Sequence, residues 1–216
     1  MAELLIDWVV VSDCATNCYI CRNSETNAGF IVDPGDSAAR IIAKTDQLGV
    51  KPEKIILTHS HYDHIGAAEE VAKHYGIQIF IGEKEEAFLH DPVSNLSASF
   101  TDKAITLDCD GVLKDGEELE LAGFRAKVIL TPGHTPGGIC LYFEDQKTLI
   151  SGDTLFCESL GRTDFPGGNT RQIVTSIINK LFVLPDDTKV YPGHMGETTI
   201  EHEKKYNPCA GFVGRV

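Results

Sequence analysis

The run from His59 to His64 contains the residue types that bind transition metals. Its six residues, His-Ser-His-Tyr-Asp-His, include three imidazoles and one carboxylate, the usual ligands of zinc and related ions. They follow an apolar, strand-like segment and precede a helix-like one. Because alternate residues of a strand point the same way, His59 and His61 are predicted to face one ion. Asp63 and His64 lie where the chain turns, and they can face a second ion. The alternative is a solvated loop that binds nothing.

Three later turns each present a candidate ligand directly after an apolar strand. Two are Pro-Gly-His sequences that present His134 and His194, and the third is a Gly-Asp turn that presents Asp153. Pro-Gly favours a tight turn, so each histidine is expected at a strand end. The remaining histidines lack such a context and are expected at the surface: His74, His90 and His202.

Strands and helices in both halves of the chain must position these turns. Strands are expected at residues 4–11, 18–22, 28–32, 54–57, 77–81, 118–121, 124–130, 139–143, 148–151 and 189–191. Helices are expected at 37–48, 67–75, 170–182 and 197–204, the first capped by Asp36 or Ser37, whereas 83–110 reads as irregular. Two packed sheets with helices outside would bury the apolar faces. No linker divides residues 1–216, which predicts one domain.

Composition and charge restrict the class of protein. The first eleven residues lack the basic region and cleavage site of a signal peptide, and no apolar run approaches the roughly 20 residues that span a bilayer. We therefore expect a cytoplasmic protein with no membrane partner. A net charge of −13, from 19 basic and 32 acidic residues, disfavours nucleic-acid binding, which needs a basic surface.

The seven cysteines predict reduced thiols, because their number is odd and no export signal is present. Cys14, Cys18 and Cys21 have the C-x3-C-x2-C spacing of iron–sulfur proteins. A strand would point Cys18 and Cys21 to opposite faces, so a shared cluster is not expected. All seven are expected to behave as small buried hydrophobic residues.

In this order the ligand motifs, from His59 to His194, resemble those of the metallo-β-lactamase superfamily. The resemblance implies an α/β fold, a four-layer αββα sandwich with a metal site along one edge. It also implies two metal ions, the first held by His59, His61 and His134, the second by Asp63, His64 and His194, and both bridged by Asp153.

Within the superfamily, a bridging aspartate with two Pro-Gly-His turns is similar to the glyoxalase II group, the hydroxyacylglutathione hydrolases. Class B β-lactamases lack this bridging carboxylate and are exported, which argues against antibiotic hydrolysis. Residues 159–168 resemble the substrate-side loop of the glyoxalase II group, and loops beside such sites commonly carry specificity. The resemblance therefore implies that Arg162, Asp164 and Phe165 contact substrate. The alternative is a plain Gly/Pro-rich connection.

The chain departs from the best-known glyoxalase II pattern in two places. Only residues 195–216 follow the last Pro-Gly-His turn, so no C-terminal glutathione-binding helical domain is expected. Gly196 stands where that group has a tyrosine beside the thiol. The chain therefore resembles short, single-domain members of the group.

The predicted function is hydrolysis of an acyl thioester, S-lactoylglutathione or a related hydroxyacyl thioester, by a hydroxide bound to two divalent ions. Asp63 is expected to act as a ligand and to orient the water or pass its proton. Zinc is expected, with iron or manganese as alternatives, since His/Asp sites accept all three. Two divalent ions contribute positive charge, and two carboxylates and a hydroxide offset most of it, so the net charge of the site is about +1. With Arg162 adding to this charge, a small anionic substrate is predicted.

Three other functions stay open at this point. A persulfide dioxygenase uses the same scaffold with one iron, and its relatives share the Gly-Arg-Thr-Asp-Phe run found here at 161–165. Against it, His64 and His194 complete a second site that a mononuclear enzyme does not need. A lactonase of the superfamily and a non-enzymatic metal-binding module are the others. The sequence leaves the oligomeric state and the thiol carrier open.

Overall fold

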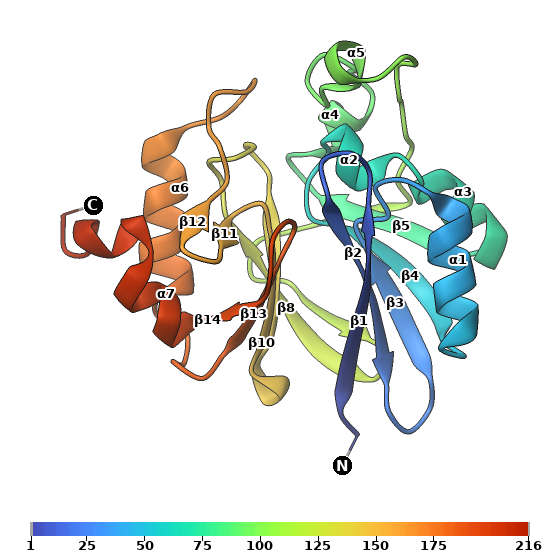
Figure 1. The fold of residues 1–216 in the computed structure, drawn as a ribbon, viewed down its shortest axis with the longest axis horizontal. Coiled ribbons are helices and arrows are strands. Elements are labelled where there is room, and N and C mark those ends of the chain that lie inside the picture. The colour runs from blue at the N-terminus through green and yellow to red at the C-terminus, as the bar shows by residue number, and fades with distance from the viewer. Residues whose placement is uncertain (1, 216) are drawn as a thin grey trace.

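The strand-forming segments of the two halves of the chain form two separate sheets (Figure 1). The computed structural model describes residues 2–215. The first sheet has the order β1-β2-β3-β4-β5-β6, and the second has the order β14-β13-β10-β9-β8-β7. The first begins with an antiparallel meander and continues with parallel strands, because helices connect β3 to β4 and β4 to β5. The remaining two strands, β11 and β12, pair with each other.

Helices follow groups of strands along the chain, and α1, α3 and α6 pack on the outer faces of the sheets. The strands are β1 (Leu4–Val11), β2 (Thr16–Asn23), β3 (Ala28–Val32), β4 (Lys51–Leu57), β5 (Gln78–Gly82), β6 (Gly111–Leu113), β7 (Glu118–Leu121), β8 (Phe124–Leu130), β9 (Ile139–Phe143), β10 (Thr148–Gly152), β11 (Leu155–Phe156), β12 (Ser159–Leu160), β13 (Lys189–Pro192) and β14 (Thr198–Thr199). The helices are α1 (Ala38–Gln47), α2 (Tyr62–Ile65), α3 (Ala68–Tyr75), α4 (Glu86–Leu89), α5 (Ser97–Phe100), α6 (Thr170–Ser176) and α7 (Ile200–Tyr206). Short turns are η1 (Glu144–Gln146), a π-helical turn η2 (Ile177–Leu181) that extends α6, and η3 (Pro208–Phe212).

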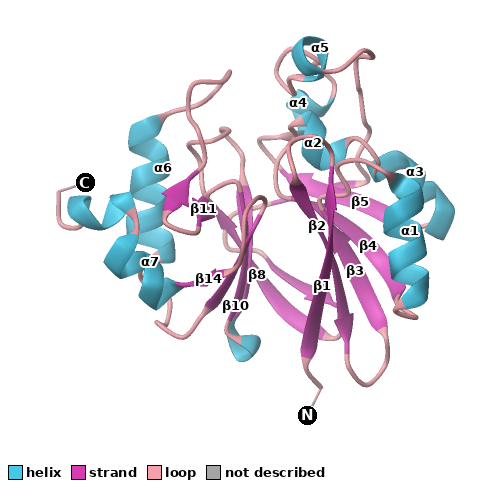
Figure 2. Ribbon diagram, viewed as in Figure 1, coloured by secondary structure: helices cyan, strands magenta, loops and turns pink. Residues whose placement is uncertain are grey.

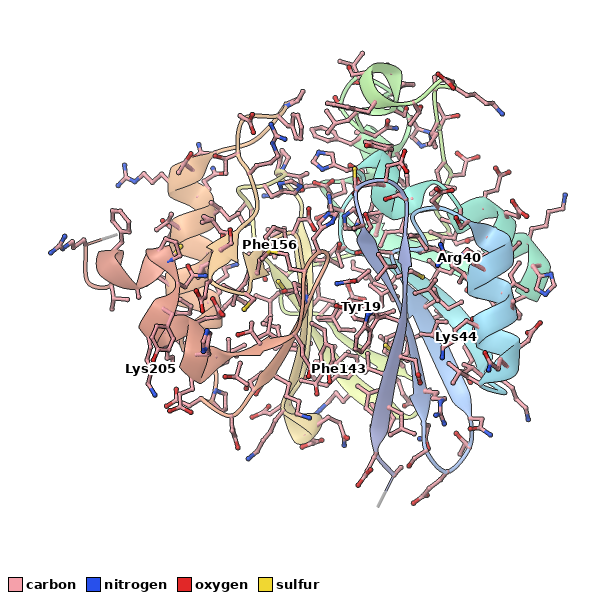
Figure 3. The ribbon with its side chains drawn as sticks, in the orientation of Figure 1. Tyr19, Arg40, Lys44, Phe143, Phe156 and Lys205 are labelled. Carbon is pink, nitrogen blue, oxygen red and sulfur yellow. The ribbon has the colours of Figure 1, made fainter. Side chains whose placement is uncertain are left out.

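Three apolar layers hold the sheets and helices together. The middle layer lies between the two sheets and includes Tyr19 and the stacked rings of Phe30 and Phe143 (Figure 3). A second layer packs α1 and α3 on the first sheet, and a third packs α6 and η2 on the other. Helices therefore cover the outer faces of a two-sheet sandwich (Figure 2), which confirms the expected αββα architecture.

Several local predictions need correction. The helix predicted at 197–204 begins only at Ile200, because Thr198 and Thr199 pair with β13 and the Thr199 hydroxyl accepts the His202 N–H as an N-cap. Ser37 precedes α1 in a left-handed conformation (φ 57°), and its side chain makes no cap hydrogen bond. The strands β6, β11 and β12 were not predicted, since segments of two or three residues carry little periodicity.

The cysteine prediction is confirmed in one part and wrong in another. Cys18 packs in the layer beneath the helices and Cys21 in the layer between the sheets, so the two thiols lie on opposite faces of β2. Cys14, however, is exposed, and Cys109 and Cys157 are only partly buried. No helix within residues 2–215 is long and apolar enough to cross a membrane.

Candidate metal centre

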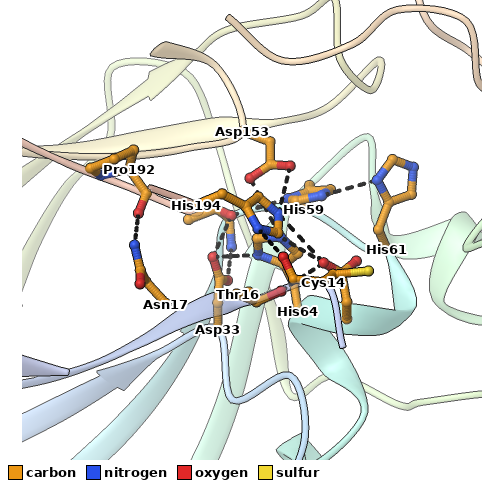
Figure 4. Close-up of polar contacts among 12 residues, drawn as sticks. Cys14, Thr16, Asn17, Asp33, His59, His61, His64, Asp153, Pro192 and His194 are labelled. Carbon is orange, nitrogen blue, oxygen red and sulfur yellow. Dashed lines mark hydrogen bonds and ion pairs between the residues drawn. The ribbon is translucent and has the colours of Figure 1, made fainter. Parts of the chain in front are cut away.

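Four strands end at one edge of the sandwich and place the predicted ligands there (Figure 4). His59 follows β4, His134 follows β8, and Asp153 and His194 follow the parallel pair β10 and β13. Backbone hydrogen bonds tie these strand ends together, including Gly193 N–H to the Gly152 carbonyl. Segments about 135 residues apart in sequence, from His59 to His194, thus meet because their strands end together.

Both Pro-Gly-His turns need glycine, because atoms of neighbouring residues lie close to its Cα. A Cβ on Gly193 would lie 2.2 Å from Asp153 Oδ1. A Cβ on Gly133, whose φ is +143°, would lie 2.2 Å from the Ile173 backbone nitrogen. A side chain at Gly133 would force the backbone to move, and one at Gly193 would displace the Asp153 carboxylate. The Pro-Gly-His motif therefore encodes how closely each histidine approaches its neighbours.

His59, His61 and His134, here called the first cluster, are buried and bring three ring nitrogens together. His61 Nδ1 lies 3.1 Å from His59 Nε2 and 2.9 Å from His134 Nε2. Burial lowers the pKa of His59 and of His61 well below the usual value, and neighbouring imidazoles lower it further. Neutral imidazole is the form that binds a metal.

Asp63, His64 and His194, here called the second cluster, are surrounded by negative charge. His64 Nε2 lies 3.4 Å from His194 Nε2 and 3.6 Å from Asp63 Oδ2. Burial alone would lower the pKa of His64, but the carboxylates of Asp153, Asp63 and Asp33 raise it to about 10. Burial would also lower the pKa of His194, but the hydrogen bond to Asp153 and the charges of Asp153 and Asp63 together raise it. Without a metal, this cluster binds protons.

The carboxylate of Asp153 lies between the two clusters. Its Oδ2 is 3.5 Å from His134 Nε2 and 3.3 Å from His194 Nε2, and its Oδ1 is 3.4 Å from His64 Nε2. Burial would raise the pKa of Asp153, but His64, His194 and His134 hold it well below the usual range. Within residues 2–215, the buried Oδ1 makes no hydrogen bond. A buried carboxylate whose Oδ1 lacks a hydrogen bond and whose Oδ2 lies near an imidazole of each cluster fits two cations.

The first cluster is supported by a buried carboxylate that the sequence did not reveal. Glu85 accepts hydrogen bonds from the Ser60 N–H (3.0 Å) and hydroxyl (2.6 Å), and from the Gly137 N–H (2.7 Å). It thereby links the loop of His59 and His61 to the turn after His134. His134 Nδ1 donates to the Arg162 carbonyl at 2.7 Å, which leaves Nε2 for a metal.

The second cluster has its own supports, also missed from sequence. Asp33 accepts hydrogen bonds from His64 Nδ1 (2.9 Å) and from the Thr58 N–H and hydroxyl. The Thr16 hydroxyl donates to Asp63 Oδ2 at 2.7 Å. His194 Nδ1 donates to the Cys14 carbonyl at 3.1 Å. Asp33 directly follows β3. The pattern that identified the ligands, a polar residue at the end of an apolar strand, therefore applies to Asp33 as well.

The residues predicted to contact substrate lie at one side of a cleft that opens onto the clusters. Arg162 and Phe165 line this cleft, whose volume is about 470 Å³. Asp164 pairs with Arg162 through two hydrogen bonds of 2.7 Å, and the pKa of Asp164 is lowered to about 2. Arg162 therefore adds no unpaired charge, unlike the sequence-based expectation. Of the other histidines, His74 and His90 are exposed, and His202 is partly buried and pairs with Glu158 at 2.9 Å.

Comparison with known proteins agrees with the fold. The sequence profile of the metallo-beta-lactamase superfamily matches residues 11–194. The hydroxyacylglutathione hydrolase GloC of Haemophilus influenzae is 36% identical over 209 residues, covering 94% of this chain and 96% of that protein. The crystal structure of BLEG-1 B3 metallo-beta-lactamase superposes with a TM-score of 0.90 at 36% identity, covering 94% of this chain and 98% of that one. The structure of TTHA1623 in a di-iron-bound form has a TM-score of 0.81 at 28% identity, with the same coverage.

Proposed function

The chain belongs to the metallo-β-lactamase superfamily, and from this premise we propose that it is a dinuclear metallohydrolase that cleaves hydroxyacyl thioesters. One observation carries the proposal: the Asp153 carboxylate lies between two groups of metal-ligating side chains. A site with one ion would need only one such group. The similarity to a hydroxyacylglutathione hydrolase supports the choice of a thioester.

The first cluster would hold one ion, the second cluster the other, and Asp153 both. Zinc suits imidazole and carboxylate donors, and the same donors accept iron or manganese. The di-iron-bound relative supports iron as an alternative. Two bound divalent ions would polarise the thioester carbonyl and lower the pKa of a water at the site.

Asp63 is the residue proposed to handle the proton. Thr16 fixes Asp63 Oδ2 with a hydrogen bond of 2.7 Å, so the carboxylate keeps one orientation toward the second cluster. A carboxylate held in this way can orient the attacking water and accept its proton. The thiolate leaving group needs no strong acid, because a thiol has a pKa of about 8.5.

The direct test is an assay of metal-quantified protein on S-lactoylglutathione. We expect about two metal equivalents per chain and release of glutathione, since the reaction uses two ions. Removal of the metals by a chelator should abolish hydrolysis, and readdition should restore it. Absence of hydrolysis by protein carrying two equivalents, against this thioester and its analogues, would contradict the proposal.

Other chemistries of the superfamily belong in the same panel. The identity to BLEG-1 B3 metallo-beta-lactamase favours β-lactam hydrolysis as a second candidate, which a chromogenic cephalosporin tests directly. A lactone substrate tests the lactonase alternative. One iron equivalent together with oxygen consumption on glutathione persulfide would instead indicate a dioxygenase. The second cluster argues against that outcome, because a mononuclear enzyme has no use for it.

A further inference from the structure

The outer part of the cleft has an aromatic wall formed by Tyr62, Phe100 and Phe165. The rings of Tyr62 and Phe100 stack at 5.9 Å with an interplanar angle of 10°. Phe100 meets Phe165 edge to face at 5.8 Å, and Phe165 meets His61 at 5.9 Å. The wall therefore runs without interruption from an exposed residue, Phe100, to a proposed metal ligand.

Apolar side chains from the second half of the chain also line this cleft. Phe156 packs against the His194 ring at 5.9 Å, and Leu160 and Met195 lie beside it. Met195 is 57% exposed and Phe100 is 56% exposed. Met195 also has a left-handed backbone (φ 70°), which is unfavourable for a residue with a side chain. Exposed apolar side chains gathered at one cleft indicate a ligand that covers them.

Among the residues that the structure describes, no unpaired Lys or Arg side chain lines the cleft. Within residues 2–215, Arg162 is the one Lys or Arg side chain that lines it. Asp164 occupies the guanidinium through two hydrogen bonds, and the guanidinium carbon lies 4.0 Å from the centre of the Phe165 ring. Arg162 thus extends the wall as a flat, charge-neutralised surface. In the described part of the chain, the cleft lining thus gives the carboxylates of glutathione no Lys or Arg side chain without a carboxylate partner of its own.

We propose that the outer cleft binds an uncharged, apolar thiol portion of the substrate, so that glutathione is a poor carrier for this enzyme. This inference rests on the proposed thioesterase function and specifies its substrate. The acyl carbonyl must reach the two clusters, and a hydroxyacyl group is small. Most of the roughly 470 Å³ of the cleft therefore remains for the group on sulfur. Contact with the aromatic wall favours an aryl or alkyl group there.

The test compares one acyl group on three thiols, using protein of known metal content. The substrates are the S-lactoyl thioesters of benzyl mercaptan, of N-acetylcysteamine and of glutathione. We expect kcat/KM to be greatest for the benzyl thioester and least for glutathione. The span should be at least about tenfold, the gain expected from covering one aromatic face. A kcat/KM for glutathione equal to or above that of the benzyl thioester would overturn the inference and leave the proposed function intact.

Two variants locate the preference in the cleft. Phe100→Ala should reduce the ratio of kcat/KM between the benzyl and glutathione thioesters, mainly through KM, while Phe212→Ala should not change it. Phe212 is a suitable control because it is also exposed and lies on η3. Asp164→Asn frees the Arg162 charge and should shift the ratio toward glutathione. An unchanged ratio in both Phe100→Ala and Asp164→Asn would overturn the inference. Hydrolysis of none of the three thioesters by metal-loaded protein would overturn the proposed function itself.

Discussion

The two clusters of the metal centre use similar side chains but differ in charge. The first cluster consists of three buried imidazoles and has no carboxylate of its own. The second contains Asp63 and is faced by Asp33 and Asp153. Without a metal, the pKa values of His59 and His61 in the first cluster are lowered, whereas those of His64 and His194 in the second are raised. Two sites that share Asp153 can therefore take up metal by different routes. The first cluster binds an ion without releasing a proton, whereas the second exchanges protons for the ion.

The supports of the two clusters, by contrast, follow one design. Each cluster is held by a buried carboxylate that is not a proposed ligand, Glu85 for the first and Asp33 for the second. Each carboxylate accepts three hydrogen bonds from the loops that carry the ligands. Such supporting groups fix the orientation of ligands before the metal arrives. Glu85 bonds to loops of the first cluster, whereas Asp33 bonds directly to His64 of the second cluster and reaches His59 of the first through the Thr58 hydroxyl.

Asp153→Ala should affect both clusters, so that they no longer differ in their ability to hold a metal. The variant lacks the carboxylate that lies between the clusters, so metal content should fall at both sites. Hydrolysis should drop at least about 10³-fold, beyond the usual loss for one electrostatic contact. Metal content by mass spectrometry and thioester hydrolysis would be measured on the same sample. Retention of two equivalents would contradict the bridging assignment.

The pH dependence of metal uptake should separate the clusters. With a pKa of about 10 in the metal-free protein, His64 is protonated at pH 6–8, and a metal must displace that proton. Apparent affinity at the second cluster should rise up to about tenfold per pH unit, since one bound proton competes. The first cluster should show little dependence, because the pKa values of His59 and His61 are lowered.

Calorimetric titration of metal-free protein in two buffers with different ionisation enthalpies measures the protons released with each equivalent. Proton release should accompany one equivalent and be nearly absent from the other. Equal release with both would mean that the charge difference between the clusters does not govern binding.

Glu85→Gln and Asp33→Asn form a matched pair of variants, each of which weakens the hydrogen-bond support of mainly one cluster. Either change places an amide NH2 against backbone or side-chain donors, so at least one hydrogen bond is lost. Metal affinity should fall about 10- to 100-fold at the corresponding cluster, the range for supporting groups of ligands. Glu85→Gln should affect the first cluster and Asp33→Asn mainly the second, because His64 bonds to Asp33 directly whereas His59 reaches it through Thr58. Loss at the same cluster in both variants would show that the supports are not separate.

Much of this centre could be predicted from sequence, and the missed part has a physical cause. His59 and Asp153 directly follow apolar strands, and strand ends gather at one edge of a sandwich. Glu85 lies in an irregular segment, and its partners Ser60 and Gly137 are set by tertiary packing alone. The pairing of Arg162 with Asp164 and the stacking of Phe100 on Tyr62 likewise depend on side-chain directions, which periodicity does not give. The metal-binding chemistry of the ligands could therefore be predicted from the sequence, whereas the pairing and stacking of the side chains that line the cleft could not.

The smallest effect is expected from Thr16→Val, which removes one hydroxyl beside the second cluster. Thr16 is buried, and valine matches its shape, so the change deletes the hydroxyl's hydrogen bond to Asp63 Oδ2 and its longer contact with the Ser12 hydroxyl at 3.3 Å. If Asp63 handles the proton, kcat should fall roughly 3- to 10-fold, as for one hydrogen bond to a charged group. KM and the metal content of the first cluster should stay the same. Thr175→Val, which deletes an exposed hydroxyl bonded to the Arg171 carbonyl on α6, is the matched control. An equal fall in kcat in both variants would attribute the loss to folding. An unchanged kcat in Thr16→Val would mean that the orientation of Asp63 by Thr16 does not contribute to catalysis.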